Sequence, residues 1–398
     1  GHVHYAATAR DARDIVLKLL KDRNAKSVTK GKSMVSEEIA LNEAMADAGI
    51  APVETDLGEY IIQLRGEHPS HIIAPAVHLN KDQIEADFRA EHTHLPADRQ
   101  LTAGAQLVGE ARQVLREKFI AADAGITGAN FLLAETGTSI IVTNEGNGDL
   151  TQSLPGAHIV LATIDKLVPT LEDASTILRL LARSATGQEF SSYTTLSTGP
   201  RRPDDPDGPR EYHVVILDNG RSAMLGTVFQ DMLRCIRCGA CLNHCPIYQA
   251  VGGHAYGWVY PGPMGAVLTP ALVGIEKAAH LPNASTFCGR CEEVCPMKIP
   301  LPGMMRHWRE REFERHLTPA SARWGLRAWT FFATRPALYR GITWAAARGL
   351  KLWCMGRGRS KTVPFAGGWT RHRDFPAPQG RTFMAQWNGG RHGAPNGR

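Results

Sequence analysis

Long apolar runs are missing from this chain of 398 residues, although 43% of its residues are hydrophobic. A transmembrane helix needs roughly 18 or more consecutive apolar residues, and we find neither such a run nor a signal peptide. We therefore expect a soluble protein of the cytoplasm. The first residues, GHVHYA, lack a starting Met and read like the middle of a domain, so we also expect sequence upstream of Gly1.

Cysteine is nearly absent outside two short segments. Seven of the eight cysteines lie between residues 235 and 295, and Cys354 stands alone in the C-terminal part. Secreted proteins held together by disulfides do not concentrate their cysteines in this way, so the pattern indicates a reducing compartment where thiolates bind metal. Cys354 is predicted to be a small buried residue and not a ligand.

Acidic residues become rare after residue 300. From there on, eighteen Lys or Arg residues face four Asp or Glu residues, and seven of the eight tryptophans lie at or beyond Trp308. Apolar and basic residues alternate between residues 319 and 357, as in basic amphipathic helices. Such helices suit docking on a partner subunit first, packing on their own domain second and peripheral membrane binding third. Binding of nucleic acid fits the concentrated cysteines poorly, so no nucleic-acid partner is predicted.

The first 225 residues alternate helix-like and strand-like segments, which predicts an α/β domain with a largely parallel sheet. Helices are expected over Ala9–Lys21, over Ser36–Ala48 and after Asn80. Strands are expected at residues 59–64, 71–74, 139–142, 158–162 and 213–217. Residues 226–318 are predicted to form a helical ferredoxin module, and residues 319–398 a basic, helical C-terminal extension.

The first cysteine motif, CIRCGACLNHCP, has the spacing C-x2-C-x2-C-x3-C-P and contains Cys235, Cys238, Cys241 and Cys245. This is the iron–sulfur spacing of bacterial ferredoxins, in which three cysteines bind one cluster and the fourth binds the other cluster. The second motif, FCGRCEEVCP, is one thiol shorter and contains Cys288, Cys291 and Cys295. When the two motifs are aligned, Ser285 takes the position of the first cysteine.

Crossed ligation follows from this alignment. Cluster one would take Cys235, Cys238, Cys241 and Cys295; cluster two would take Cys245, Cys288 and Cys291, with Ser285, water or nothing at its fourth corner. We therefore expect one 4Fe-4S cluster and a second that is 3Fe-4S, or 4Fe-4S with an unusual fourth ligand. Zinc is the alternative, but it prefers paired C-x2-C knuckles. His244 and His254 either tune a cluster or are structural.

Four further segments are distinctive: GKSMVSEE from residue 31, AETGT from residue 134, NEGN from residue 144 and RDFPAP from residue 373. Together with both cysteine motifs, they resemble the lactate-utilisation iron–sulfur protein (LutB) family over nearly the whole chain. The resemblance implies a first domain, the LUD domain, that is related to the sugar-isomerase and CoA-transferase fold. It also implies a three-component system that oxidises L-lactate to pyruvate, with a cysteine-rich subunit and a smaller LUD-domain subunit as partners.

The first domain also contains candidates for ligand contact, namely Lys30, Lys32, Glu135, Thr136, Asn144 and Glu145. Glu145 lies in a turn rich in Gly and Asn, and in the CoA-transferase relatives such a turn carries a glutamate that forms a covalent thioester. An acyl-transfer enzyme with structural metal clusters is therefore the second functional hypothesis. Fold kinship does not transfer chemistry, so Glu145 is predicted first as a turn residue, next as a ligand contact and last as a nucleophile.

No G-x-G-x-x-G fingerprint follows a predicted strand, so we expect no resident dinucleotide. Iron–sulfur clusters transfer single electrons, whereas the oxidation of lactate removes two electrons together with protons. A partner or another site must therefore carry out the bond-breaking step. The chain is predicted to be the iron–sulfur electron-transfer subunit of the lactate-oxidising complex, with no catalytic residue assigned.

Overall fold

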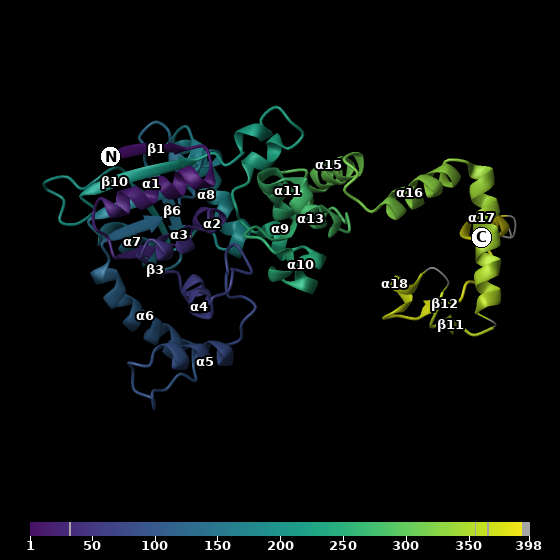
Figure 1. Ribbon diagram of the computed structural model, residues 1–398, viewed down its shortest axis with the longest axis horizontal. Coiled ribbons are helices and arrows are strands. Elements are labelled where there is room, and N and C mark those ends of the chain that lie inside the picture. The colour runs from purple at the N-terminus through teal and green to yellow at the C-terminus, as the bar shows by residue number, and fades with distance from the viewer. Residues whose placement is uncertain (32, 355, 364–365, 392–398) are drawn as a thin grey trace, which may run out of the picture. The chain divides into compact units, whose positions relative to one another are not determined.

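The computed structural model describes residues 1–31, 33–354, 356–363 and 366–391 (Figure 1). The chain divides into two compact units, residues 1–314 and residues 315–398. The α/β part and the cysteine-rich helical part both lie in the first unit. The boundary between them at residue 225, like the division at residue 318, stays a prediction.

A six-stranded sheet lies at the centre of the α/β part, in the order β1-β10-β7-β4-β2-β3, and all neighbouring strands are parallel. The strands are β1 (His2–Ala6), β2 (Ser27–Lys30), β3 (Ala51–Glu54), β4 (Ala124–Thr127), β7 (Ala157–Thr163) and β10 (Glu211–Leu217). Strand β7 is buried along its full length, as an apolar strand covered on both faces must be. The predicted parallel sheet is therefore confirmed.

Helices and a smaller sheet complete this part. The helices are α1 (Ala9–Lys21), α2 (Met34–Glu38), α3 (Leu41–Asp47), α4 (Leu57–Arg65), α5 (Lys81–Glu91), α6 (Gly104–Ala121), α7 (Asn147–Ser153) and α8 (Leu171–Thr186). The smaller sheet has the order β8-β5-β6-β9. Its strands are β5 (Phe131–Leu133), β6 (Ser139–Thr143), β8 (Leu167–Val168) and β9 (Tyr193–Ser197).

Two predicted strands are wrong. Residues 59–64 belong to helix α4, whose first turn is capped by Asp56 accepting from the N–H groups of Gly58 and Glu59. The helix ends at Gly66 in the left-handed conformation, with φ of 63°. Residues 71–73 form bends and residue 74 has no regular structure, because the His71 ring accepts from the N–H groups of Ile73 and Ala74 and closes a local turn.

The helix predicted over Ser36–Ala48 is two helices, α2 and α3. Ser33, three residues earlier than expected, is the N-cap, and its side chain accepts from the N–H of Ser36. Ala40 has φ of 51°, which a continuous right-handed helix cannot contain. The break turns α3 onto the sheet, where Leu41 and Met45 are fully buried.

The cysteine-rich part is helical, as predicted. Its helices are α9 (Ala240–Asn243), α10 (Pro246–Val251), α11 (Gly262–Val273), α12 (Ile275–Ala278), α13 (His280–Asn283), α14 (Arg290–Glu293) and α15 (Leu301–Glu314). It packs closely on the α/β part. The Tyr248 hydroxyl donates to the Ser70 carbonyl at 2.7 Å, and a Cβ added at Gly253 would lie 1.6 Å from the same oxygen.

The second unit contains the helices α16 (Ala320–Ala333), α17 (Pro336–Trp353), α18 (Gly367–Thr370) and α19 (Phe383–Arg391) and the short strands β11 (Arg359–Ser360) and β12 (Phe375–Pro376). No side chain of α16 or α17 is buried. Cys354, directly after α17, is 2% exposed and therefore buried as predicted. Among the described helices, none combines the length and apolar character that a membrane crossing requires.

Candidate functional site

Four thiols from both sequence motifs line one cavity, namely Cys235, Cys238, Cys241 and Cys295. The first follows a 3-10 turn over Gln230–Arg234, the third lies in α9, and the last follows α14. Cys238 and Cys295 are buried. The second motif therefore contributes a thiol to the set that the first motif begins.

The other three thiols line a second cavity together with Ser285, namely Cys245, Cys288 and Cys291. Cys245 comes from the first motif and precedes α10, where its sulfur accepts from the N–H of Tyr248 at 3.5 Å. Cys288 is exposed, whereas Cys291 is buried. His244 lines this cavity as well. The two cavities contain the residue sets of the predicted crossed ligation.

The same turn is built twice in the two motifs. Arg237 and Phe287 have φ of 60° and 55°, and Gly239 and Gly289 have φ of 74° and 82°. Each pair flanks a cysteine, Cys238 or Cys288, so the backbone folds in the same way around both. Left-handed conformations are rare outside glycine, and their repetition at matching positions supports the alignment that places Ser285 opposite Cys235.

The chemistry of these sulfur sets fits metal clusters. Burial, with a smaller contribution from neighbouring cysteines, raises the pKa of Cys238 and that of Cys291 to about 11. Burial and neighbouring thiols raise the pKa of Cys241 well above its ordinary value. Thiolates crowded in this way need a metal cation beside them, because a coordinated thiol is deprotonated outright. Seven such sulfurs in two sets suit two iron–sulfur clusters.

A chain of buried charges connects the first cysteine motif to the α/β part. Arg221 binds Glu38 through two contacts, at 2.9 and 2.5 Å, and its Nε lies 3.1 Å from Asp165. Asp165 also contacts Arg237 at 3.3 Å. The Tyr260 hydroxyl donates to Glu38 at 2.6 Å. Burial alone would lower the pKa of Arg237, but Cys235 and Asp165 raise it above its ordinary value.

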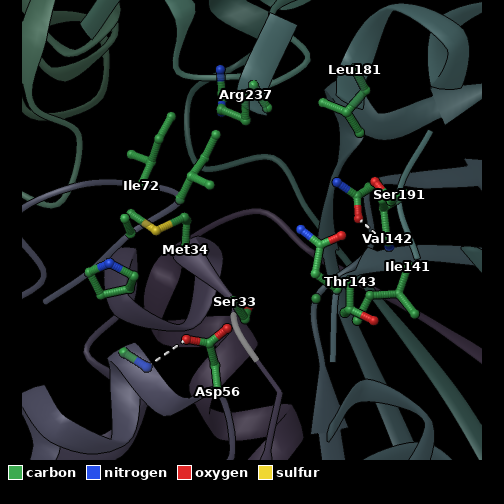
Figure 2. Close-up of a pocket in the computed structure, with 18 of the residues that line it drawn as sticks. Ser33, Met34, Asp56, Ile72, Ile141, Val142, Thr143, Leu181, Ser191 and Arg237 are labelled. Atoms are coloured by element: carbon green, nitrogen blue, oxygen red, sulfur yellow. Dashed lines mark hydrogen bonds between the residues drawn. The ribbon is translucent and has the colours of Figure 1, made fainter. Parts of the chain in front are cut away.

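A large cavity of about 550 Å³ adjoins the first cysteine set (Figure 2). Arg237 and Tyr260 come from the cysteine-rich part, whereas Lys166 comes from the loop after β7. The Lys166 amine lies 3.4 Å from the Cys235 carbonyl oxygen, so this side of the cavity is next to the first set of thiols. Figure 2 shows Arg237 at the opposite end of the cavity from Asp56.

The structure separates the ligand-contact candidates of the first domain. Asn144 and Glu145 are exposed and line the large cavity, where Asn144 accepts from the N–H of Ser192 at 3.2 Å. Glu135 and Thr136 are exposed at the other end of β6 and do not line it. Lys32 lies outside the described residues.

Two further candidates have structural partners. Lys30 is buried and contacts Glu54 at 2.6 Å and Glu37 at 2.7 Å, so its charge is neutralised within the fold and an anion is not needed. One His254 ring nitrogen lies 2.7 Å from the His68 carbonyl oxygen. Of the two histidines considered from sequence, only His244 lines a thiol cavity.

Sequence reasoning missed Lys166, Arg237 and Tyr260. Arg237 lies inside the first motif, where the variable positions of a C-x2-C spacing are not informative. Lys166 is 71 residues and Tyr260 is 23 residues from Arg237 along the chain, and only folding brings the three residues to one cavity. The sequence offered one signal for this cavity, namely that Arg237 is a charged residue between two cysteines of the motif.

Family comparisons cover nearly the whole chain. Residues 1–217 match the family model of the LUD domain, residues 231–299 match the 4Fe-4S dicluster domain, and residues 304–389 match the C-terminal region of lactate utilisation protein B. The match over both motifs supports iron–sulfur clusters as the groups that the thiols hold.

Curated relatives agree with these matches. A lactate utilization protein B from Macrococcus caseolyticus is 46% identical over 96% of this chain and 80% of its own. Those from Oceanobacillus iheyensis and Bacillus subtilis are 45% and 44% identical over 98% and 96% of this chain and 80% of theirs. A DUF162 family structure from Deinococcus radiodurans, 14% identical over 52% of this chain and 98% of its own, has a TM-score of 0.23, too low to support an argument. The chain belongs to the lactate utilisation protein B family.

Proposed function

We propose that this chain is the iron–sulfur electron-transfer subunit of a system that oxidises L-lactate to pyruvate. The observation that carries the proposal is the gathering of all seven motif cysteines at two neighbouring cavities, one of them completed by a thiol from the other motif. The names of the relatives supply the substrate.

Cluster one is assigned to Cys235, Cys238, Cys241 and Cys295 as a 4Fe-4S cluster. Cluster two is assigned to Cys245, Cys288 and Cys291, as a 3Fe-4S cluster or as a 4Fe-4S cluster with an atypical fourth ligand. Each group, when bound, takes up or gives one electron. Two electrons and two protons leave L-lactate when pyruvate forms. Two one-electron clusters in one chain can therefore take up both electrons, whereas the protons must be taken up elsewhere.

The partners in this proposal are a cysteine-rich subunit and a smaller LUD-domain subunit, and the complex belongs to the cytoplasm. The exposed aromatic and basic face of α16 and α17 supports docking on one of these subunits, because Trp324, Trp329 and Trp344 are each more than half exposed. Peripheral contact with the inner face of the membrane is the second use of this face. We also assign the α/β part to the sugar-isomerase and CoA-transferase class of folds.

Metal analysis with electron paramagnetic resonance tests the proposal. Protein purified without oxygen should contain about seven or eight iron atoms and about eight sulfides per chain, in two clusters. With both partner subunits present, L-lactate should reduce these clusters, whereas D-lactate and the chain alone serve as controls. Stoichiometric zinc without iron, or clusters that lactate leaves oxidised in the complete system, would overturn the electron-transfer function.

Replacing Ser285 by cysteine should give cluster two a full set of ligands. Ser285 lines the second cavity, and its hydroxyl accepts from the N–H of Phe287 at 3.1 Å in the repeated turn. In Ser285→Cys, we expect about eight iron atoms per chain and a 4Fe-4S signal that persists in air longer than in the parent protein. Ala284→Cys, at the exposed neighbouring position that does not line this cavity, is the matched control. An unchanged cluster composition in Ser285→Cys would place Ser285 away from the open corner.

A further inference from the structure

The large cavity lies between the carboxyl ends of the parallel strands and the first cysteine motif. Its lining includes Ser33, Asp56, Asn130 and Thr163, which follow or end the strands β2, β3, β4 and β7. In open α/β sheets, ligands bind in the crevice outside the carboxyl ends of the strands. Both the location and the volume of about 550 Å³ therefore fit a binding site for a small organic molecule.

Two cationic side chains, Lys166 and Arg237, line one end of this cavity. Arg221, Arg237 and Lys166 are the cations of the buried group there, whereas Glu38 and Asp165 are its carboxylates. Asp165 is shared between the two arginines, and Glu38 is bound by Arg221. Within the described part of the chain, the buried Nη1 of Arg237 has no hydrogen-bond partner.

The cationic end can bind a carboxylate. A guanidinium offers its N–H donors in a planar fork that matches the two oxygens of a carboxylate, and the Lys166 amine adds a donor. Both cations line the cavity, and among the described residues the Lys166 amine makes one hydrogen bond, the 3.4 Å contact with the Cys235 carbonyl. An anion placed here would be next to the backbone of the first thiol set.

The rest of the lining is mainly apolar and would accept a carbon chain. Ile141, Val142 and Leu181 lie on the side formed by the small sheet and α8 (Figure 2), and Ile72 and Met34 lie across from them. This space is larger than a three-carbon acid requires. A longer acid would cover more of the apolar lining and should bind more tightly, because each buried methylene adds a similar amount of binding free energy.

We propose that this cavity binds a 2-hydroxy or 2-oxo acid, with its carboxylate at Arg237 and Lys166 and its carbon chain toward Leu181 and Ile141. The proposal rests on the proposed function, since it names the substrate class of the same centre. It places the acid on this chain, beside cluster one, and concerns binding only.

Calorimetry on the full chain, purified without oxygen and with its cluster content measured, tests the proposal. The probes are L-lactate, 2-hydroxybutyrate, 2-hydroxyhexanoate and the neutral lactamide. We expect affinity to rise by about fourfold for each added methylene, and lactamide to bind at least tenfold more weakly than lactate. Equal binding of lactamide and lactate, or no binding of any acid at millimolar concentration, would overturn the proposal.

Two variants identify the site. Lys166→Met should weaken the binding of 2-hydroxyhexanoate at least tenfold. Lys298→Met is the matched control, because Lys298 is exposed, lies three residues from Cys295 and does not line the cavity. Ala182→Leu, which fills the apolar side next to Leu181, should reduce the preference for 2-hydroxyhexanoate over L-lactate and keeps the test available if Lys166→Met does not fold.

The outcomes are distinguishable from those of the proposed function. If Lys166→Met and Lys298→Met weaken binding equally, the cations only balance charge near the thiols and the acid site is wrong. Clusters without acid binding would leave electron transfer standing and refute the acid site. Acid binding that depends on Lys166 and on chain length in protein without clusters would support the site and refute electron transfer.

Discussion

Replacement of Cys295 by alanine is expected to remove cluster one, although Cys295 belongs to the second motif. Iron should fall by about four atoms per chain, and the signal of cluster two should remain. The reason is geometric, since the Cys295 side chain lines the cavity of Cys235, Cys238 and Cys241 and not that of its own motif. Iron analysis and electron paramagnetic resonance of the purified variant give the result directly.

Cys354→Ala is the matched control, because it removes a buried cysteine that lies outside both motifs. It should leave the iron content unchanged. Cys291→Ala should give the reverse pattern of Cys295→Ala, since Cys291 lines the second cavity, although the two residues are four positions apart. If Cys295→Ala and Cys291→Ala both remove only cluster two, each motif binds its own cluster and crossed ligation is wrong.

The two cysteine motifs could be found from sequence because the information in each is local. Cluster-binding loops are tight turns, and their spacing fixes which sulfurs face the same way. The alignment of the two endings predicts that Cys295 binds cluster one. Cys295 lines the cavity of the first motif, and its ligation stays a prediction. The same alignment predicts that Cys245 shares a cluster with Cys288 and Cys291, and these three residues line one cavity.

The parallel sheet could also be predicted from sequence, whereas helix α4 could not. The apolar run Tyr60, Ile61 and Ile62 is buried on all sides, so it lacks the spacing that separates a helix from a strand. The signals that decide are at the ends of the helix: Asp56 caps its first turn, and Gly66 ends it with a left-handed residue. Weighing the caps above the run would have given the correct element.

The cationic end of the cavity could not be predicted, because it depends on contacts between distant parts of the chain. Lys166 and Arg237 are 71 residues apart, and Arg221 meets Glu38 across 183 residues. No periodicity or spacing encodes such pairs. The residues around Glu145 were found by resemblance, and the structure adds that Asn144 and Glu145 share a cavity with Arg237.

Loss of Arg221 should strongly destabilise the first unit. Arg221 and Glu38 are each 1% exposed at the side chain, and Arg221 also contacts Asp165. Methionine at position 221 fills a similar volume but leaves two carboxylates buried without this partner. Breaking a buried ion pair in this way costs about 3–5 kcal/mol, so Arg221→Met should lower the free energy of unfolding by that amount. Urea unfolding of the purified chain without oxygen, followed by circular dichroism, measures the change.

The control is Arg10→Ala, which removes an ion pair with Asp14 whose side chains are 84% and 66% exposed. Solvent screens that pair, so the loss should be much smaller than for Arg221→Met. Adding Glu38→Gln to Arg221→Met should recover part of the loss, because the buried charge that Arg221 neutralised is then absent as well. If Arg221→Met is no more destabilising than Arg10→Ala, the ion pairs of Arg221 do not stabilise the first unit. In that case its stability rests on apolar contacts, such as those of Ile72 and Met224 in the core of the cysteine-rich part.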